Sequence, residues 1–184
     1  MENAKQNSSG VAFKWAMFYV VVSIVLTYVW QFLNVDQTSA VKYVGYLPFI
    51  AFLLLAQKEH RENLGGFITF GQAFVAGLLY SIIGAVVISI FVYIYFAFLS
   101  PEVFNKIMDT QRDAMTQKGM SSDQVDQAME IMKKYGALIT AFVSIFAIAI
   151  FGIIVALVGA AIFKKERTIQ DIEQNSGSFT DPAV

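Results

Sequence analysis

The sequence predicts an all-α integral membrane protein with four transmembrane helices and a helical hairpin between the third and the fourth. Three observations lead to this fold class. Hydrophobic residues make up 57% of the chain and charged residues only 15%, against roughly 25% charged in typical soluble proteins. Several apolar stretches are long enough to cross a hydrocarbon core of about 30 Å. The one long polar stretch between them, residues 100–136, has the spacing of two amphipathic helices.

The sequence evidence is stronger for the first predicted span than for the second. Residues 15–33 contain no charge, and Trp15 and Trp30 mark the two ends in the manner of interfacial anchors. Residues 43–56 form the weaker candidate, because the stretch is short and Pro48 would remove a backbone hydrogen bond and kink the helix. We still expect it to span, since the polar stretches on either side then lie on opposite faces of the membrane.

The third and fourth predicted spans are longer. Residues 70–99 are apolar for about 45 Å of helix, which exceeds the hydrocarbon core and requires tilt or protrusion. Residues 137–163 carry no charge and end at a basic cluster that begins with Lys164. No Asp, Glu, Lys, Arg or His lies inside any of the four spans.

The polar segment 100–136 predicts an extracytoplasmic helical hairpin. Cap and turn signals mark its helix ends: Ser100, Pro101 and Glu102 at the first start, Gly119 at the turn, and Ser121 with Gln124 at the second start. Apolar residues recur three or four positions apart in both helices, so two apolar faces pack together or lie on the membrane surface.

This pattern divides the chain into three parts. Residues 1–14 form an N-terminal tail, residues 15–166 form the membrane domain, and residues 167–184 form a flexible C-terminal tail. Lys and Arg in the short flanks of the spans favour the cytoplasm for both termini.

The composition excludes several kinds of site. The chain has no cysteine, so disulfides, thiolate metal sites and cysteine nucleophiles are ruled out. Its single histidine, His60, lies in "KEHRE", which indicates a charged cytoplasmic turn rather than a metal site. With a formal net charge of -1 and no basic stripe, the chain is not expected to bind nucleic acid. We predict no catalytic, cofactor-binding or metal-binding residue and no cofactor.

Two groups of residues in the hairpin are candidates for a chemical function, the first for copper binding and the second for acid-base catalysis. Thioethers select Cu(I), and five methionines fall here: Met108, Met115, Met120, Met129 and Met132. Their helical spacing favours packing instead. The hairpin also carries five carboxylates: Asp109, Asp113, Asp123, Asp126 and Glu130. They alternate with Lys and Arg as on a solvated helical face, which argues against an acid and base pair.

Small residues repeat every four positions in the last two long spans. Such ladders let helix backbones approach closely in lipid. The predicted helix-packing residues are Ala73, Gly77, Ser81, Ala85 and Ser89 in the third span, and Gly152, Ala156 and Ala160 in the fourth. We expect the two ladders to pack within one chain, with a contact between two chains as the alternative.

Three stretches carry a family resemblance: "GGFITFGQAFVAGLL" at the start of the third span, "FLSPEVFNKIMD" at its exit and "KGMSSDQVDQAMEIMKK" before the last span. Together they resemble the four-span membrane proteins of Bacteroidetes-type bacteria catalogued as the domain of unknown function 4199, over roughly residues 10–165. The resemblance implies a protein of the bacterial inner membrane without an assigned activity. It carries over no catalytic or binding residue.

Three function classes remain. The leading hypothesis is a non-catalytic accessory or scaffold subunit of the cell envelope, whose partners are the lipid bilayer and a second copy or another membrane protein. The alternative is a transporter or channel for a small uncharged or lipid-like solute, with a path lined by hydroxyls: Ser23, Thr27, Ser81, Ser89, Thr140 and Ser144. The third is a lipid-modifying membrane enzyme that uses the hairpin carboxylates.

Overall fold

The computed structural model describes residues 8–33 and 40–166, so the predicted tail 167–184 lies outside the described residues. The described chain is helical and contains no β-strand, with one isolated antiparallel bridge between Ile68 and Lys165. The predicted all-α class is therefore confirmed.

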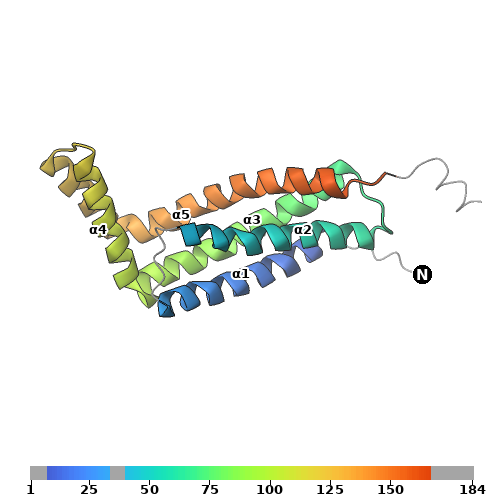
Figure 1. Ribbon diagram of the computed structural model, residues 1–184, viewed down its shortest axis with the longest axis horizontal. Helices are drawn as coiled ribbons and strands as arrows, with labels where there is room; N and C mark the ends of the chain where they lie inside the picture. The colour runs from blue at the N-terminus through green and yellow to red at the C-terminus, as the bar shows by residue number, and fades with distance from the viewer. Residues whose placement is uncertain (1–7, 34–39, 167–184) are drawn as a thin grey trace, which may run out of the picture. The chain divides into compact units, whose positions relative to one another are not determined.

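Seven helical elements follow one another (Figure 1). They are α1 (Ser8–Phe32), the 3₁₀ helix η1 (Ala40–Gly45), α2 (Tyr46–Asn63), α3 (Phe70–Ile94), the π-helical turn η2 (Tyr95–Leu99), α4 (Pro101–Gln117) and α5 (Ser122–Phe163). Within the described residues, three stretches are long and apolar enough to cross a membrane: Ser8–Phe32, Phe70–Leu99 and Ser122–Phe163. This is the pattern of a multi-pass membrane protein.

The second predicted span is not among these three. Its apolar residues belong to α2, whose last turns carry four charged residues: Lys58, Glu59, Arg61 and Glu62. The kink predicted at Pro48 is not needed, because this residue lies in the first turn of α2. Backbone N–H groups in a first turn have no intrahelical acceptor, so proline removes no hydrogen bond there.

Two helices extend beyond the predicted spans. The first helix begins at Ser8 rather than at residue 15, so the second half of the expected N-terminal tail is helical. The second helix of the hairpin and the last predicted span form one helix. α5 runs without interruption over 42 residues, about 63 Å of helix. Gly136 lies within it, where the lack of a side chain leaves room for the ring of Phe104.

The chain forms two compact units. The terminal unit comprises Met1–Ser81 and Gly152–Val184, and the central unit comprises Ile82–Phe151. α3 and α5 therefore contribute one part to each unit. We describe each unit by itself.

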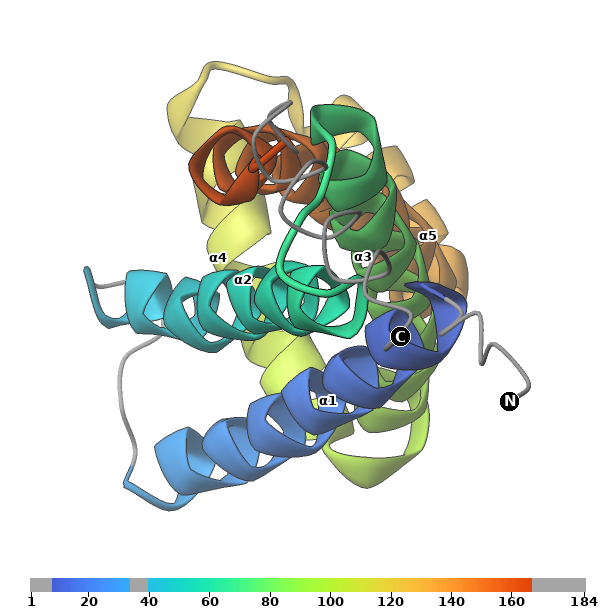
Figure 2. The same ribbon diagram turned by 90° about the vertical axis from the view of Figure 1, so that its right-hand side faces the viewer.

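In the terminal unit, α1 and α2 lie side by side (Figure 2) and pack through aromatic rings. The Tyr19 and Phe49 rings meet edge to face with centroids 5.2 Å apart. Tyr80 of α3 is fully buried and donates its hydroxyl hydrogen to the Phe49 carbonyl at 3.1 Å. These contacts join the first three helices, and the outward faces of α1 stay apolar and exposed, as lipid-facing surfaces are.

In the central unit, α4 packs against the first turns of α5 to form the predicted hairpin. Its core consists of Phe104, Met108, Val125 and Met129, with Phe96, Met115 and Met132 packed against it. Four of the five hairpin methionines are therefore packing residues, and Met120 is exposed.

The helix ends of the hairpin follow the sequence signals with one exception. Gly119 has a φ of +80° at the end of α4. Ser121 and Gln124 form the capping box of α5, with the two reciprocal bonds at 3.2 and 3.4 Å. Ser100 precedes Pro101 at the start of α4, but its side chain makes no cap hydrogen bond, contrary to the prediction.

Candidate functional site

Two buried polar residues of the terminal unit, Gln57 and His60, lie in the last turns of α2. Residues Gln57 to Arg61 follow the apolar part of this helix and are themselves helical, so "KEHRE" is not the turn that the sequence suggested. The turn comes later, at Gly65 and Gly66, which have φ values of +81° and +87°. His60 is buried, with only 6% of its surface exposed.

Gln57 links α2 to two other helices. Its side chain is fully buried, and Nε2 donates to the Ala73 carbonyl of α3 at 3.0 Å and to the Ala156 carbonyl of α5 at 2.9 Å. Both neighbours are acceptors, so the nitrogen must face them, and this fixes the orientation of the amide. The side-chain oxygen has no hydrogen-bond partner among the described residues.

Glycines on the facing helices make room for this amide. A Cβ atom on Gly77 of α3 would lie 2.7 Å from Gln57 Nε2 and 2.8 Å from the Ala156 Cβ atom. A Cβ atom on Gly159 of α5 would lie 2.9 Å from Gln57 Cδ. Close approach of the three backbones therefore depends on two positions without side chains.

The eight predicted helix-packing residues are all buried. In the terminal unit the two ladders face each other: Gly77 lies against Ala156, and a Cβ atom on Gly152 would overlap the Ser81 side chain. Ala85 and Ser89 belong to the central unit. The small residues of α3 and α5 in the terminal unit thus meet within one chain.

Sequence reasoning missed the role of Gln57, because the second predicted span ends at residue 56, just before it. One signal was present. The buried positions of α2 are Phe49, Leu53, Ala56, Gln57 and His60. Their helical spacing continues the apolar stripe through both polar residues, which marks them as inward-facing.

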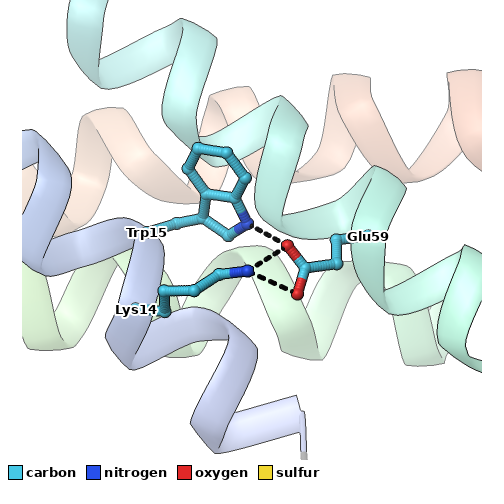
Figure 3. Close-up of polar contacts among 3 residues, drawn as sticks. All are labelled: Lys14, Trp15 and Glu59. Atoms are coloured by element: carbon cyan, nitrogen blue, oxygen red, sulfur yellow. Dashed lines mark hydrogen bonds and ion pairs between the residues drawn. The ribbon is translucent and has the colours of Figure 1, made fainter.

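A second polar cluster ties the start of α1 to the end of α2 (Figure 3). Lys14 Nζ lies 2.6 Å from one carboxylate oxygen of Glu59 and 2.5 Å from the other, and Trp15 Nε1 donates to the same carboxylate at 2.8 Å. Burial raises the pKa of Glu59. The hydrogen bonds from Lys14 and Trp15 and the positive charge of Lys14 outweigh this effect, so the pKa of Glu59 lies below its ordinary value.

His60 has no partner for its Nδ1 atom among the described residues. Burial lowers the pKa of His60, because the surroundings solvate the charged imidazolium poorly. Arg61 stacks its guanidinium over the Phe163 ring at 5.7 Å, and its Nε atom is also buried without a hydrogen-bond partner. Each of these two side chains therefore has a buried nitrogen atom, His60 Nδ1 or Arg61 Nε, that makes no hydrogen bond among the described residues.

Most hydroxyls of the suggested channel path already donate a hydrogen bond within their own helix. Four of the six donate to a backbone carbonyl one turn earlier in their own helix: Thr27, Ser81, Ser89 and Ser144. This is the ordinary behaviour of such side chains in apolar helices.

The five hairpin carboxylates are all exposed. Arg112 pairs with Asp126 at 2.6 Å across a groove of about 460 Å³ between α4 and α5. Within the described residues, no group of three or more acidic or histidine side chains is placed to hold a metal ion. The hairpin offers no enclosed acid and base pair.

The Gly77 contact predicts a sharp difference between two glycines of α3. Gly77→Ala should lower the free energy of unfolding by about 2 kcal/mol, because the new methyl group overlaps Gln57 and Ala156. Gly71→Ala is the matched control, since its Cβ atom would meet nothing within 4 Å. Denaturant titration of the purified chain in detergent micelles measures both. Equal losses for the two variants would contradict the proposed contact.

The lowered pKa of Glu59 predicts a pH dependence. Because the pKa is lower in the folded than in the unfolded chain, the stabilisation is complete above the unfolded value of 4.5 and is lost as the pH falls through the folded value. In a Trp30→Phe background, Trp15 fluorescence should therefore change only below about pH 4.5. Glu59→Gln should abolish the transition. A transition that persists in Glu59→Gln would assign it to another group.

The comparisons with known proteins give a family and nothing more specific. No curated protein and no solved structure matches the chain. The family model described as "Protein of unknown function (DUF4199)" matches residues 14–165, which extend from within α1 past the end of α5. The chain belongs to this family of proteins of unknown function.

Proposed function

We propose that the chain is a non-catalytic, multi-pass protein of the bacterial inner membrane that acts as an accessory or scaffold subunit. The observation that carries the proposal is the use of the buried polar groups. The Gln57 amide nitrogen donates hydrogen bonds to carbonyls of two neighbouring helices. Four hydroxyls in the apolar helices donate to backbone carbonyls of their own helix. Side chains that serve helix packing in this way leave little polar surface for a solute path.

The exposed surface supports the same proposal. α5 presents large apolar side chains outward along its length, including Phe142 at 62% and Phe146 at 58% exposure. Lipid or another membrane protein can cover such a face. The hairpin carboxylates, in contrast, lie open to solvent and lack the enclosed setting that a lipid-modifying enzyme needs.

We further propose that α2 crosses the membrane as a fourth span, together with η1. α2 accompanies α1 from end to end. At one end Trp15 contacts Phe52 with centroids 5.7 Å apart and bonds to Glu59. At the other, a Cβ atom on Gly45 would lie 3.1 Å from the Trp30 ring. Between these contacts each helix covers about 21 Å or more, to which η1 adds further length.

Four crossings place the start of α1, the end of α2, the start of α3 and the end of α5 on one side. Two contacts support this grouping: Lys14 with Glu59, and the backbone pair between Ile68 and Lys165. This side carries an excess of basic residues in short flanks, which favours the cytoplasm. Both termini then lie in the cytoplasm and the hairpin lies outside it.

Single cysteines test the topology cleanly, because the chain has none of its own. A membrane-impermeant maleimide should label Tyr43→Cys and Gln117→Cys in intact spheroplasts. It should label Glu62→Cys only after lysis. Labelling of positions 43 and 62 from the same side would show that α2 re-enters instead of crossing.

Crosslinking in native membranes tests the scaffold role. A cysteine at the exposed Phe142 should give a discrete adduct with a second copy or another membrane protein, recovered with the tagged full chain. Ala141→Cys is the matched control, because this neighbouring residue is only 7% exposed. If single cysteines along the exposed faces of α1 and α5 yield only monomer, the scaffold proposal fails.

A further inference from the structure

The helical hairpin of the central unit has one charged side. A groove of about 460 Å³ runs along this side between α4 and α5. Apart from methionines of the hairpin core, the side chains that line it are polar or charged: Asn105, Asp109 and Arg112 from α4, and Asp126, Glu130 and Lys133 from α5. These residues are exposed, so this side of the hairpin is suited to contact with water.

The flank of α4 opposite the groove carries no charge, and the structure describes the whole of this helix. Each residue turns an α-helix by about 100°, so the positions directly before and directly after a core residue point to opposite flanks. Phe104 belongs to the hairpin core and Asn105 lines the groove, which puts Val103 on the other flank. The helical period adds three more residues to the flank of Val103: Ile107, Thr110 and Ala114.

The first turns of α5 repeat this division. Met129 belongs to the core and Glu130 lines the groove, so Ala128 lies on the flank opposite the groove. The helical period adds three more residues to the flank of Ala128: Gln124, Ile131 and Tyr135. Because both helices line the same groove, their opposite flanks also share one side of the hairpin. We call these two flanks together the uncharged face.

Large apolar side chains of the uncharged face are exposed on both helices. Ile107 of α4 is 39% exposed, and Ile131 and Tyr135 of α5 are 56% and 47% exposed. Single exposed apolar residues are common on soluble proteins, but these gather on one side of a hairpin whose other side is charged. Such a separation is typical of helices that lie in the interface of a membrane.

The uncharged face continues along α5 into the apolar stretch of the central unit. Ile139, Phe142 and Phe146 follow Tyr135 at intervals of three or four residues, so they lie on the same side of the helix. They are 45%, 62% and 58% exposed. The proposed function places this part of α5 in the bilayer. The uncharged face is therefore continuous with a lipid-facing surface, which favours lipid as its neighbour.

The connections of the hairpin keep it close to the membrane. α4 begins one residue after η2 ends, and α5 runs without interruption from the hairpin into the apolar stretch. Within the central unit, α4 leaves η2 at a steep angle to the preceding part of α3 (Figure 1). A helix at a steep angle to a membrane-spanning helix runs along the bilayer surface instead of away from it. With 17 residues, α4 is long enough to follow that surface for about 26 Å.

We propose that the uncharged face of the hairpin lies on the phospholipid surface of the bilayer and that the charged groove faces water. Ile107 and Ile131 then enter the boundary between headgroups and acyl chains, where the apolar sides of interfacial helices are buried by about 5–10 Å. Tyr135 lies in the interface, where tyrosine is enriched. The ammonium of Lys134, 5.2 Å from the centre of the Tyr135 ring, lies at the level of the lipid phosphates. This position of the hairpin rests on the membrane crossings of the proposed function, which bring it to the bilayer surface.

Nitroxide accessibility in vesicles of phosphatidylethanolamine and phosphatidylglycerol tests this position. The chain has no cysteine of its own, so the full chain can carry one spin label at a time. Oxygen concentrates in the lipid, whereas a nickel chelate stays in the water. Labels at Ile107→Cys and Ile131→Cys should be relaxed more by oxygen than by the chelate. The matched controls, Asp109→Cys and Glu130→Cys, lie on the groove side, and the chelate should relax them several-fold more strongly.

Two results would overturn the proposal. Equal relaxation by the chelate at Ile131→Cys and Glu130→Cys would show that both sides of the hairpin face water. Weak relaxation by both reagents at Ile131→Cys would show that protein covers the uncharged face instead of lipid. The pair on α4 repeats the comparison independently of any change that a label causes in α5. Maleimide labelling and crosslinking test the topology and the scaffold role at other positions, so those proposals can hold where this one fails.

Discussion

The absence of water from a lipid interior constrains this protein more than any other condition. Every backbone or side-chain polar group at membrane depth has to find its partner within the protein. The side-chain nitrogen of Gln57 meets this condition with two carbonyl acceptors on different helices, at 3.0 and 2.9 Å, whereas its oxygen has no partner among the described residues. A single amide thereby fixes where α2, α3 and α5 stand relative to one another in the terminal unit.

The glycines follow from the same constraint. An amide can reach a backbone carbonyl only where the facing helix leaves space, and Gly77 and Gly159 provide that space beside Gln57. Association in lipid gains nothing from the exclusion of water, so it depends on close contact and on hydrogen bonds. The terminal unit combines close helix contact and interhelical hydrogen bonds around Gln57. The Lys14 and Glu59 pair has a different setting, because it joins two helix ends where charged side chains can reach water.

Several features of this fold could be predicted from the sequence because their causes are local. The left-handed Gly119 and the capping box at Ser121 depend only on neighbours within a few residues. The continuity of α5 could not be predicted, since the change from polar to apolar sequence near Gly136 is compatible with two helices as well as with one. The role of Gln57 was hidden for a related reason. Its acceptors are backbone carbonyls of distant helices, which side-chain patterns do not reveal.

The π-helical turn at Tyr95–Leu99 has a consequence for how α3 is continued into α4. The N–H of Ser100 bonds to the carbonyl of Tyr95, five residues back, at 2.8 Å, where an α-helix would reach back four. The turn therefore accommodates one surplus amino acid. A relative with a one-residue deletion here would close the turn as ordinary α-helix. Because the wider turn takes up the extra residue locally, this deletion would leave the directions of the side chains before and after the turn unchanged, so alignments of the family should place a single-residue gap at this turn.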